Sequence, residues 1–578
     1  MIAATKNLQA RFEQLFDPLP YAEPTPPSKV QAGVYLAVAI AFLVEVVFTR
    51  SSFVGDSYFY IDDILGYLRG DPAATARMAD SGHLLLRPLG AILSPLASHL
   101  VSRNAADVRL WSVTAALVAL NWIGTLVCAI CIAAWGLRIT RSPVVSTVAA
   151  IGFLYTNTIL SYSRSGTSYI PGVACLILAA YVASGQRSRG WAPGFLAGIA
   201  VLFWLPYAFT VPAVLFSRNL SPASWQPPVS RRFVNFAVRF CIVTGLVVAV
   251  GYSVAIHLRG ISNWADLMHW VREAAHGVSR QGRLLRSFFG MPRSLIAMSN
   301  EGIIFKRFLF HDPYAKVTWL DILRVSLAKA AIFYLGVAFL MWRLLVSVIG
   351  RRVFYVFVLA LIPNLMVALA YESGSIERYL AIFPFLFLGA AVVMSEWRSS
   401  RSSAWAIALL IGALSIGNAI SLSANRVKSA LQQEDNRVAV LSQCSVSDKV
   451  FLLTGQDGLF AVRYRLFDTR AKSLPYLVPV EPVTGDVAAW RSMFAAITLE
   501  TWRKGGSVWV TRRVLANTPE PEWNWVEGDD SRISWKAVHA FFDQLDPDEI
   551  LGGADGIFKI APSERNQQIL SGLVPHAH

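Results

Sequence analysis

Charged residues are scarce in this chain. Asp, Glu, Lys and Arg make up 15% of its 578 residues, whereas soluble domains carry about 25%. Hydrophobic residues make up 54%, and the mean hydropathy is +0.47. Long apolar runs between residues 31 and 422 cause this deficit, and a single soluble core of that size would need a polar shell that the chain lacks. The composition therefore excludes one soluble globular domain and predicts a polytopic α-helical membrane protein.

Cysteine is also scarce, with five residues in the chain. Cys128 and Cys131 form a C-x-x-C pair, but no second Cys pair or His accompanies it as a metal or redox motif would require. Cys175 and Cys241 lie in apolar runs as well, and Cys444 stands alone. We expect no disulfide framework and interpret the membrane cysteines as positions in packed helices.

The formal net charge of +15 is compatible with binding nucleic acid, anionic lipid or an anionic substrate such as a lipid phosphate. The basic residues lie in short clusters between apolar runs, which is typical of cytoplasmic loops in membrane proteins. We therefore expect membrane lipid as a partner and no nucleic acid. The chain also lacks an internal repeat, and its tail lacks a phosphate-binding glycine loop.

Apolar runs predict about eleven membrane-spanning helices. They lie at 31–48, 108–135, 143–160, 168–184, 191–204, 206–217, 234–257, 323–346, 353–371, 379–395 and 404–422. Residues 1–30 are polar, and the first run lacks a small-residue cleavage site, so we interpret it as an uncleaved signal anchor. The short runs on either side of Leu205-Pro206 are either a hairpin or one broken helix. The stretch 83–101 is apolar but holds an Arg and two Pro residues, and we expect it to be interfacial or half-inserted.

Arginine clusters between the runs predict the orientation. If 83–101 does not cross, all the clusters lie on one side, which the positive-inside rule makes cytoplasmic. The clusters are Arg138 with Arg141, Arg187 with Arg189, Arg218 with Arg231 and Arg232, Arg343 with Arg351 and Arg352, and Arg398 with Arg401. We therefore expect a cytoplasmic segment 1–30, a transmembrane domain over 31–422 with outside loops 49–107 and 258–322, and an outside domain over 423–578.

The tail 423–578 predicts a small α/β domain. Its expected strands are 449–454, 476–480, 507–513 and 556–560, and its expected helices are 425–442, 486–503 and 534–545. Alternation of strands and helices favours a partly parallel sheet.

The first outside loop carries an acidic residue directly after the first span. Asp56 lies between Gly55 and Ser57, and Asp62 and Asp63 follow it at i+6 and i+7, so one of them can share its helix face. A carboxylate at the membrane surface can accept a proton from an acceptor hydroxyl. Asp is also a preferred helix cap, and residue type alone favours the alternative that Asp56 caps a helix that begins at Ser57, although the two roles are compatible.

The same loop continues with His83 and Arg87, whose spacing places both on one face of a helix. Such a face suits a phosphate, because Arg makes bidentate contacts and His can donate a hydrogen bond. The alternative is that Arg87 only reaches lipid headgroups.

Three further charged residues are candidates. Arg378 lies in the short outside loop 372–379, where Glu377 either neutralises it or belongs to the same site. Arg164 is another outside cation near the membrane. Glu45 lies near the outer end of the first span, where a buried acid is costly and is a functional candidate by default.

The order of these features resembles the GT-C superfamily of membrane glycosyltransferases, which use polyprenyl-phosphate-linked sugars. The resemblance covers roughly residues 30–422. It rests on Gly55-Asp56-Ser57 after the first span, the segment His83 to Pro88, Glu377-Arg378-Tyr379 before a run containing Pro384, and the inferred topology. The chain departs from many members in having no second acid directly after Asp56 and three leucines after His83.

The resemblance implies an enzyme of a bacterial inner (plasma) membrane that moves a sugar from a polyprenyl-phosphate donor to a glycan, lipid or protein acceptor outside the cytoplasm. Asp56 would be the general base of one inverting displacement. Cations would stabilise the departing prenyl phosphate. The implied substrate-binding residues are His83, Arg87, Arg378, Glu377, Tyr379, Arg164, Asp62 and Asp63.

Fixed arginines can replace a metal beside a leaving phosphate, so we expect no cofactor, with a divalent metal as the alternative. Two other functions stay open from the sequence. One is a transporter or flippase of lipid-linked sugars. The other is a non-catalytic envelope assembly protein whose tail binds partners.

Overall fold

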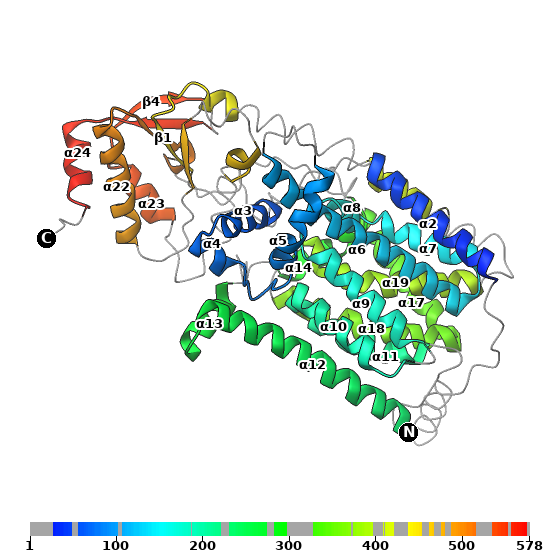
Figure 1. Cartoon of the computed structure of the whole chain (residues 1–578). Helices are drawn as coiled ribbons and strands as arrows, with labels where there is room; N and C mark the ends of the chain where they lie inside the picture. Colours follow the sequence, from blue (N-terminus) through cyan, green and yellow to red (C-terminus); the bar gives the residue numbers. More distant parts are fainter. Residues whose placement is uncertain are drawn as a thin grey trace, which may run out of the picture. The chain divides into compact units, whose positions relative to one another are not determined.

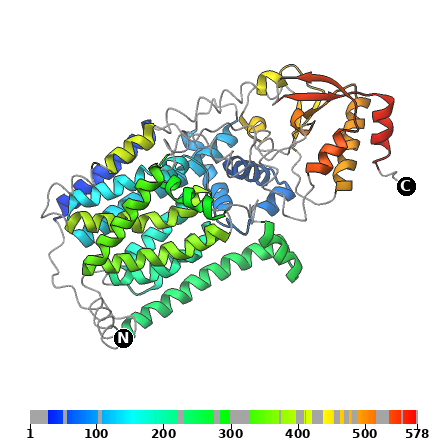
Figure 2. The same cartoon turned by 180° about the vertical axis from the view of Figure 1, so that it is seen from behind.

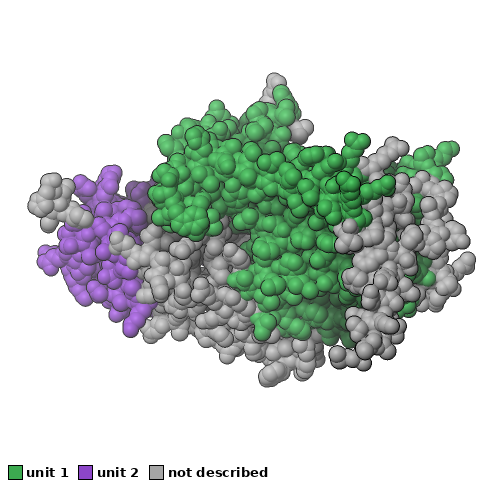
Figure 3. Space-filling view, turned by 90° about the horizontal axis from the view of Figure 1, so that it is seen from below, with its two compact units in different colours: residues 1–276, 282–300, 319–426 green, residues 277–281, 301–318, 427–578 purple. Residues whose placement is uncertain are grey.

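The computed structural model describes two compact units, coloured separately in Figure 3. Described residues up to 420 belong to unit 1, and those from 437 belong to unit 2. The described ranges are 27–48, 56–101, 107–185, 188–220, 230–273, 283–297, 328–370, 374–396, 409, 411–420, 437–452, 462–467, 475–479, 487–515, 535–552 and 556–574. The predicted features that lie outside the described residues are segment 1–26, residues 274–282 and 298–322 of loop 258–322, most of the predicted helix 425–442, Arg187, Arg398 and Arg401.

Unit 1 is helical, and its described residues include six helices long and apolar enough to cross a bilayer. They are α2 (Ser28–Phe48), α6 (Val108–Thr140), α12 (Arg231–Arg259), α17 (Ala328–Val346), α18 (Val348–Ala370) and η5 (Ile376–Ile382) continued by α19 (Phe383–Glu396). About 20 helical residues suffice for a hydrocarbon core of about 30 Å. The chain is thus a multi-pass membrane protein, and the number of eleven spans stays a prediction.

The other predicted runs form shorter apolar helices. They are α7 (Pro143–Leu154) with α8 (Asn157–Tyr162), α9 (Tyr169–Ala183), α10 (Trp191–Phe203), η2 (Leu205–Thr210) with α11 (Val211–Phe216) and η3 (Ser217–Leu220), and Ile411–Ile420. The predicted run 143–160 is therefore two helices rather than one. The side chain of Thr156 accepts the Ile159 N–H and begins the second of them.

The runs around Leu205-Pro206 form a hairpin. The backbone of Trp204 is extended and separates α10 from η2. At the far end of this segment, Arg218 Nη1 donates to the carbonyl of Ala183 at 3.4 Å, at the end of α9. The chain therefore returns to the side on which α10 begins, which decides between the two alternatives left open by the sequence.

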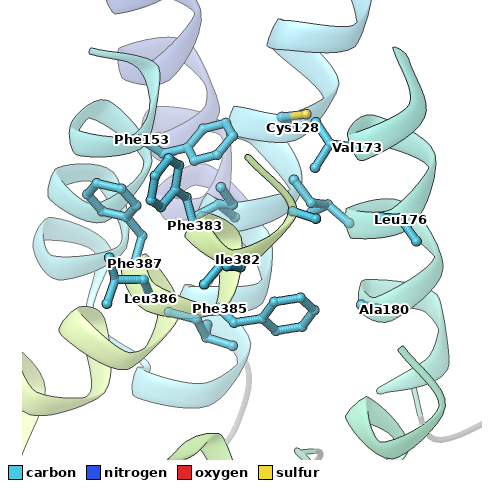
Figure 4. Packing of buried hydrophobic residues seen from close by; sticks show 14 of the residues in the cluster. Cys128, Phe153, Val173, Leu176, Ala180, Ile382, Phe383, Phe385, Leu386 and Phe387 are labelled. Atoms are coloured by element: carbon cyan, nitrogen blue, oxygen red, sulfur yellow. The ribbon is translucent and has the colours of Figure 1, made fainter. Parts of the chain in front are cut away.

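Helix α6 packs against α2, α5 (Leu86–Ala97), α7, α9 and α19 (Figure 1). Aromatic pairs from different helices fill the space between them, with Phe153 and Phe387 meeting edge to face at a ring separation of 6.1 Å. Figure 4 shows this apolar cluster, in which Cys128 lies close to Val173 of α9. All five cysteines are free thiols, and Cys128 is fully buried among apolar side chains, so it is a packing residue.

Glycines let α10 approach α12 closely. A Cβ at Gly194 would lie 2.6 Å from the Phe240 carbonyl oxygen, and a Cβ at Gly198 would lie 2.7 Å from the Cβ of Val247. Thr244 Oγ1 also donates to the Gly194 carbonyl at 3.0 Å. Small residues spaced four apart are typical of tight helix contacts in membranes. Figures 1 and 2 both show α12 alongside α10.

The described part of the predicted first outside loop, residues 56–101, folds into short helices. They are α3 (Asp56–Leu68), α4 (Pro72–Arg77), α5 (Leu86–Ala97) and η1 (Ser98–Leu100). Helix α4 begins after Asp71 because Asp71 Oδ1 accepts the N–H of Ala73 at 2.9 Å. Helix α5 has 12 residues and is about 18 Å long, which fits an interfacial segment better than a crossing one.

Two helices of the second outside loop are described, α13 (Trp264–Glu273) and α14 (Arg283–Leu295). Helix α12 ends at Arg259. The next residue, Gly260, has a φ of +65°, and this left-handed backbone conformation terminates the helix. Helix α13 then contacts the segment before His83. Trp270 Nε1 donates to the Ala79 carbonyl at 2.9 Å, and Ser81 Oγ donates to the Trp270 carbonyl at 3.1 Å. The second outside loop therefore helps to fix the first.

Unit 2 contains a five-stranded sheet among its described residues, in the order β2-β1-β3-β5-β4. The strands are β1 (Lys449–Leu452), β2 (Tyr476–Pro479), β3 (Val508–Thr511), β4 (Pro547–Leu551) and β5 (Ile557–Ile560). The helices include α22 (Val487–Arg503), η8 (Arg512–Leu515), α23 (Trp535–Phe542) and α24 (Glu564–Ser571), and residues 437–441 and 462–467 are helical as well. Strand β1 pairs in parallel with β2 and β3, and β5 is antiparallel to β3 and β4. The partly parallel sheet is as the sequence predicts.

The four predicted strands and two predicted helices of this region, 486–503 and 534–545, appear with shifts of a few residues. Strand β4 and helix α24 were not predicted. Strand β4 reads Pro-Asp-Glu-Ile-Leu and its first four residues are exposed, so it lacks the alternation of apolar and polar residues that marks a half-buried strand.

Candidate active site

Asp56 is the first residue of α3, and its side chain is exposed. The helix forms because apolar side chains recur on one face, and Tyr60, Ile61 and Ile64 are buried against the rest of unit 1. An acid in the first turn also interacts favourably with the helix dipole. The expected helix therefore begins at Asp56 itself, and packing of the buried face fixes where the carboxylate lies.

The Asp56 carboxylate contacts Tyr169, the first residue of α9. Tyr169 Oη donates to Asp56 Oδ2 at 3.2 Å. The Tyr169 ring meets the rings of Tyr162, Trp204 and His83 edge to face at centre separations of 5.1, 4.9 and 5.8 Å. Tyr169 thus connects the acid of the first outside loop to three other elements.

His83 lies against the same tyrosine and is half-buried. Its Nδ1 is 2.5 Å from Ser168 Oγ and 3.3 Å from the Phe203 carbonyl oxygen. Burial lowers the pKa of His83 below its usual value, although the nearby Asp80 acts in the opposite direction. The ring is therefore neutral at pH 7 and takes part in hydrogen bonding rather than as a cation.

The late loop contributes Arg378, which lies in η5. Its guanidinium carbon is 5.0 Å from the centre of the Trp204 ring, and its Nε is 3.9 Å from Glu377 Oε1. Glu377 is buried and accepts a hydrogen bond from Tyr162 Oη at 2.7 Å. The neighbouring Tyr379 is fully buried, with its Oη 3.1 Å from Ser287 Oγ of α14.

Three predicted site residues therefore meet around one pair of aromatic rings. Asp56 and His83 contact Tyr169, Arg378 contacts Trp204, and the Tyr169 and Trp204 rings are 4.9 Å apart. The residues come from segments separated by up to about 320 positions in the chain, and the fold alone brings them together. An acid, a neutral imidazole and a cation in this arrangement can deprotonate a hydroxyl and stabilise an anion.

Arg87 lies in a buried ion-pair network instead. Its Nε is 3.0 Å from Asp63 Oδ2, its Nη1 is 2.9 Å from Asp80 Oδ2, and its guanidinium lies 4.5 Å from the centre of the Tyr60 ring. Asp63 also pairs with Arg77 at 2.5 Å. The network ties α3 to α5 and to the segment before it. Two carboxylates thus hold Arg87, and these contacts favour a positioning role over phosphate binding.

Asp80 was not among the predicted residues. Burial would raise its pKa, but His83 when its ring is protonated, the charge of Arg87, and hydrogen bonds from Arg87 and the Gly82 N–H lower it well below its usual range. Asp80 is therefore ionised throughout the physiological range. The prediction that His83 and Arg87 share a helix face is wrong, because α5 begins at Leu86 and His83 lies in the turn before it.

Arg164 holds the outer end of α2. Its Nη2 donates to the carbonyl of Glu45 at 2.7 Å and to the carbonyl of Val46. Glu45 is fully buried, and its Oε1 accepts a hydrogen bond from Ser163 Oγ at 2.8 Å. Both residues thus stabilise the contact of α2 with the segment between α8 and α9. Asp62 is half-buried on α3.

Sequence reasoning missed the aromatic residues that join the site. Tyr162, Tyr169 and Trp204 lie at the ends of apolar runs, where the sequence does not distinguish them from ordinary core residues. The break before Leu205-Pro206 was the available signal, since it places Trp204 at a turn. Among the described residues, no three His, Cys, Asp or Glu side chains converge as metal ligands.

Comparison with known proteins rests on structure. No family model and no curated protein matches the sequence. The crystal structure of ArnT from Cupriavidus metallidurans bound to undecaprenyl phosphate is similar with a TM-score of 0.52 and 9% identity, covering 95% of this chain and 100% of that chain. ArnT from the same organism in the apo state is similar with a TM-score of 0.47 and 10% identity, covering 94% and 98%. The chain therefore shares the fold of ArnT over nearly its whole length.

Proposed function

We propose that this protein is a membrane glycosyltransferase that moves a sugar from a polyprenyl-phosphate donor to an acceptor outside the cytoplasm. The observation that carries the proposal is the meeting of Asp56, His83 and Arg378 around Tyr169 and Trp204. The fold supports the choice of donor, because the similar ArnT structure holds undecaprenyl phosphate.

In the proposed reaction, Asp56 acts as general base. Its carboxylate accepts the proton of an acceptor hydroxyl while the hydroxyl oxygen attacks the anomeric carbon of the sugar. The bond between that carbon and the phosphate oxygen breaks, and the electron pair leaves with the prenyl phosphate. One displacement of this kind inverts the anomeric centre. The exposed position of Asp56 suits an acceptor that arrives from outside.

Arg378 stabilises the departing phosphate. The Trp204 ring holds one face of its guanidinium, which limits the side-chain freedom that a flexible cation would lose on binding. His83 is neutral at pH 7 and contributes a hydrogen bond rather than a charge. Because a fixed arginine supplies the positive charge, transfer proceeds without a divalent metal in this proposal.

The other predicted residues act by holding these three. Arg87 and Asp63 fix α3, and Glu377 and Tyr379 fix the segment of Arg378. Arg164 fixes the end of α2, and Asp62 lies on α3 beside the site. We place the protein in a bacterial inner membrane with residues 1–30 in the cytoplasm and the domain over 423–578 outside, because this orientation puts the arginine clusters inside.

The test uses the purified full chain in lipid nanodiscs with a polyprenyl phosphate that carries a labelled sugar and a mixed pool of glycan, lipid and protein acceptors. Release of free prenyl phosphate together with a labelled acceptor is expected. Movement of intact donor between the leaflets of proteoliposomes, without release of prenyl phosphate, would instead identify a flippase and contradict the proposal. A chelator in a parallel reaction is expected to leave the rate unchanged.

A further inference from the structure

Two tyrosines at the outer ends of neighbouring helices make parallel contacts with the two acids of the site. Tyr162 Oη donates to Glu377 Oε2 at 2.7 Å, and Tyr169 Oη donates to Asp56 Oδ2 at 3.2 Å. Their rings meet edge to face at a separation of 5.1 Å. The same side-chain type thus contacts the acid of the first outside loop and the acid of the late loop.

The Tyr169 ring has little freedom to move. It packs against Trp204 and His83 as well as Tyr162, and it is almost completely buried. Its own backbone carbonyl accepts a hydrogen bond from Tyr207 Oη at 2.6 Å. The Tyr169 hydroxyl is therefore fixed by its surroundings, whereas the side chain of Asp56 is exposed at the start of a helix.

We propose that Tyr169 is a positioning residue for Asp56, one that holds Oδ2 of the carboxylate and leaves Oδ1 to accept the proton of the acceptor. This inference rests on the proposed transferase function for its catalytic meaning. Geometry of this kind matters for a general base, because proton transfer requires the acceptor oxygen within hydrogen-bond reach in the right direction. Tyr162 holds Glu377 in the same manner, on the side of Arg378.

Two variants separate the role of the Tyr169 hydroxyl from the packing role of its ring. Its ring contributes packing to His83 and Trp204, and the Tyr169→Phe variant keeps that ring while removing Oη alone. Tyr162→Phe is the matched control, because it removes a buried hydroxyl from the adjacent ring without touching the bond to Asp56.

The first experiment is independent of transferase activity. The full-length protein and both variants, in lipid nanodiscs, are treated with a carbodiimide and an amine at one pH, and the rate of labelling of Asp56 is measured by peptide mass spectrometry. Carbodiimides react at a carboxyl oxygen. Tyr169 Oη contacts Asp56 Oδ2 in the unmodified protein, so Tyr169→Phe should raise the rate of labelling of Asp56 by about two- to tenfold, as expected for the loss of one hydrogen bond. Tyr162→Phe should leave the rate of labelling of Asp56 unchanged, and an unchanged rate in Tyr169→Phe overturns the proposal.

The second experiment measures transfer. Tyr169→Phe is expected to lower kcat about tenfold with the donor KM retained. A raised donor KM with kcat retained would identify a packing role and contradict the proposal. Absence of transfer in the unmodified protein would contradict the proposed function instead. The labelling of Asp56 in the two variants would still decide whether Tyr169 positions Asp56.

Discussion

The guanidinium carbon of Arg378 lies 5.0 Å from the centre of the Trp204 ring, and its Nε lies 3.9 Å from Glu377 Oε1. The Trp204 ring covers one face of the guanidinium, and the acid belongs to the preceding residue, Glu377. Because Trp204 also contacts Tyr169, the position of the cation is tied to that of the residue that contacts Asp56. Asp56 and Arg378 are thus held by one aromatic pair rather than by separate parts of the fold.

Replacing Arg378 should remove most of the stabilisation of the departing phosphate. We expect Arg378→Ala to lower kcat by about 10²–10³, the range found when one preorganised donor to a developing charge is lost. Arg378→Lys should recover part of this loss, since it keeps the charge but not the planar group that stacks on Trp204. Steady-state transfer kinetics with a labelled polyprenyl-phosphate sugar measure both.

Arg239→Ala is the matched control for Arg378. The Arg239 guanidinium carbon lies 5.9 Å from the centre of the Trp191 ring on the far part of unit 1, so its removal deletes a similar cation–aromatic pair. Unchanged kinetics are expected. Equal losses in the two variants would show that the Arg378 effect is one of folding, and the proposed role would fail.

Asp56→Asn should abolish transfer and leave the protein folded in the membrane. Asn cannot accept the proton, yet it keeps the size of the side chain and its exposed position at the start of α3. Transfer assays and the thermal unfolding midpoint in detergent measure the two effects separately. Asp266→Asn makes the same change on the exposed helix α13 and should alter neither. Normal transfer by Asp56→Asn would rule out the assigned base.

Arg87→Met should destabilise the protein, because it leaves Asp63 and Asp80 buried without the cation they share. Breaking a buried pair from one side costs about 3–5 kcal/mol. Arg77→Met removes a half-exposed partner of the same Asp63 and should cost about 0–1 kcal/mol. The midpoints of thermal unfolding in detergent at pH 7 compare the stabilities of Arg87→Met and Arg77→Met. Similar midpoints for Arg87→Met and the unmodified protein would mean that Arg87 is available for another role.

The loss of stability in Arg87→Met should depend on pH. The pKa of Asp80 is lowered in the folded protein, so its contribution to stability is present above the usual carboxyl pKa of about 4 and is lost as the pH falls below that value. In Arg87→Met, Asp80 stays desolvated but loses the charge and the hydrogen bond of Arg87. Its carboxyl therefore becomes protonated at a higher pH, which relieves the cost of burying its negative charge. The difference in unfolding midpoint between Arg87→Met and the unmodified protein should therefore become smaller as the pH is lowered from 7 to 5.

The sequence was sufficient to single out Asp56, His83 and Arg378 as candidates, because charged or polar residues at the ends of apolar runs are rare and the arginine clusters predict on which side they lie. It was not sufficient to identify Tyr169 and Trp204. Aromatic residues in apolar runs look alike in sequence, and only the packing of α9 against the α10 hairpin makes these two the neighbours of the charged residues.

Arg87 shows a second limit of sequence reasoning. Its place in the outside loop was predicted, but the identity of its partners depends on how α3, α4 and α5 pack, and no pattern in the chain encodes that Asp63 and Asp80 both reach it. Helix boundaries are a related limit. A proline-containing segment was interpreted as helical from His83, whereas α5 begins three residues later at Leu86, so the spacing argument for a shared face did not apply.

Close packing of α10 on α12 offers a prediction about folding alone. A Cβ at Gly194 would lie 2.6 Å from the Phe240 carbonyl oxygen, which is backbone and cannot move aside easily, so Gly194→Ala must push the helices apart. Overpacking of this kind costs about 1–3 kcal/mol and should lower the unfolding midpoint in detergent. Gly245→Ala makes the same change at an exposed position of α12 with no atom within 4 Å of the new Cβ, and it should leave the midpoint unchanged or slightly raised because alanine favours the helix. If both variants unfold at the midpoint of the unmodified protein, the close approach of these two helices does not contribute to stability.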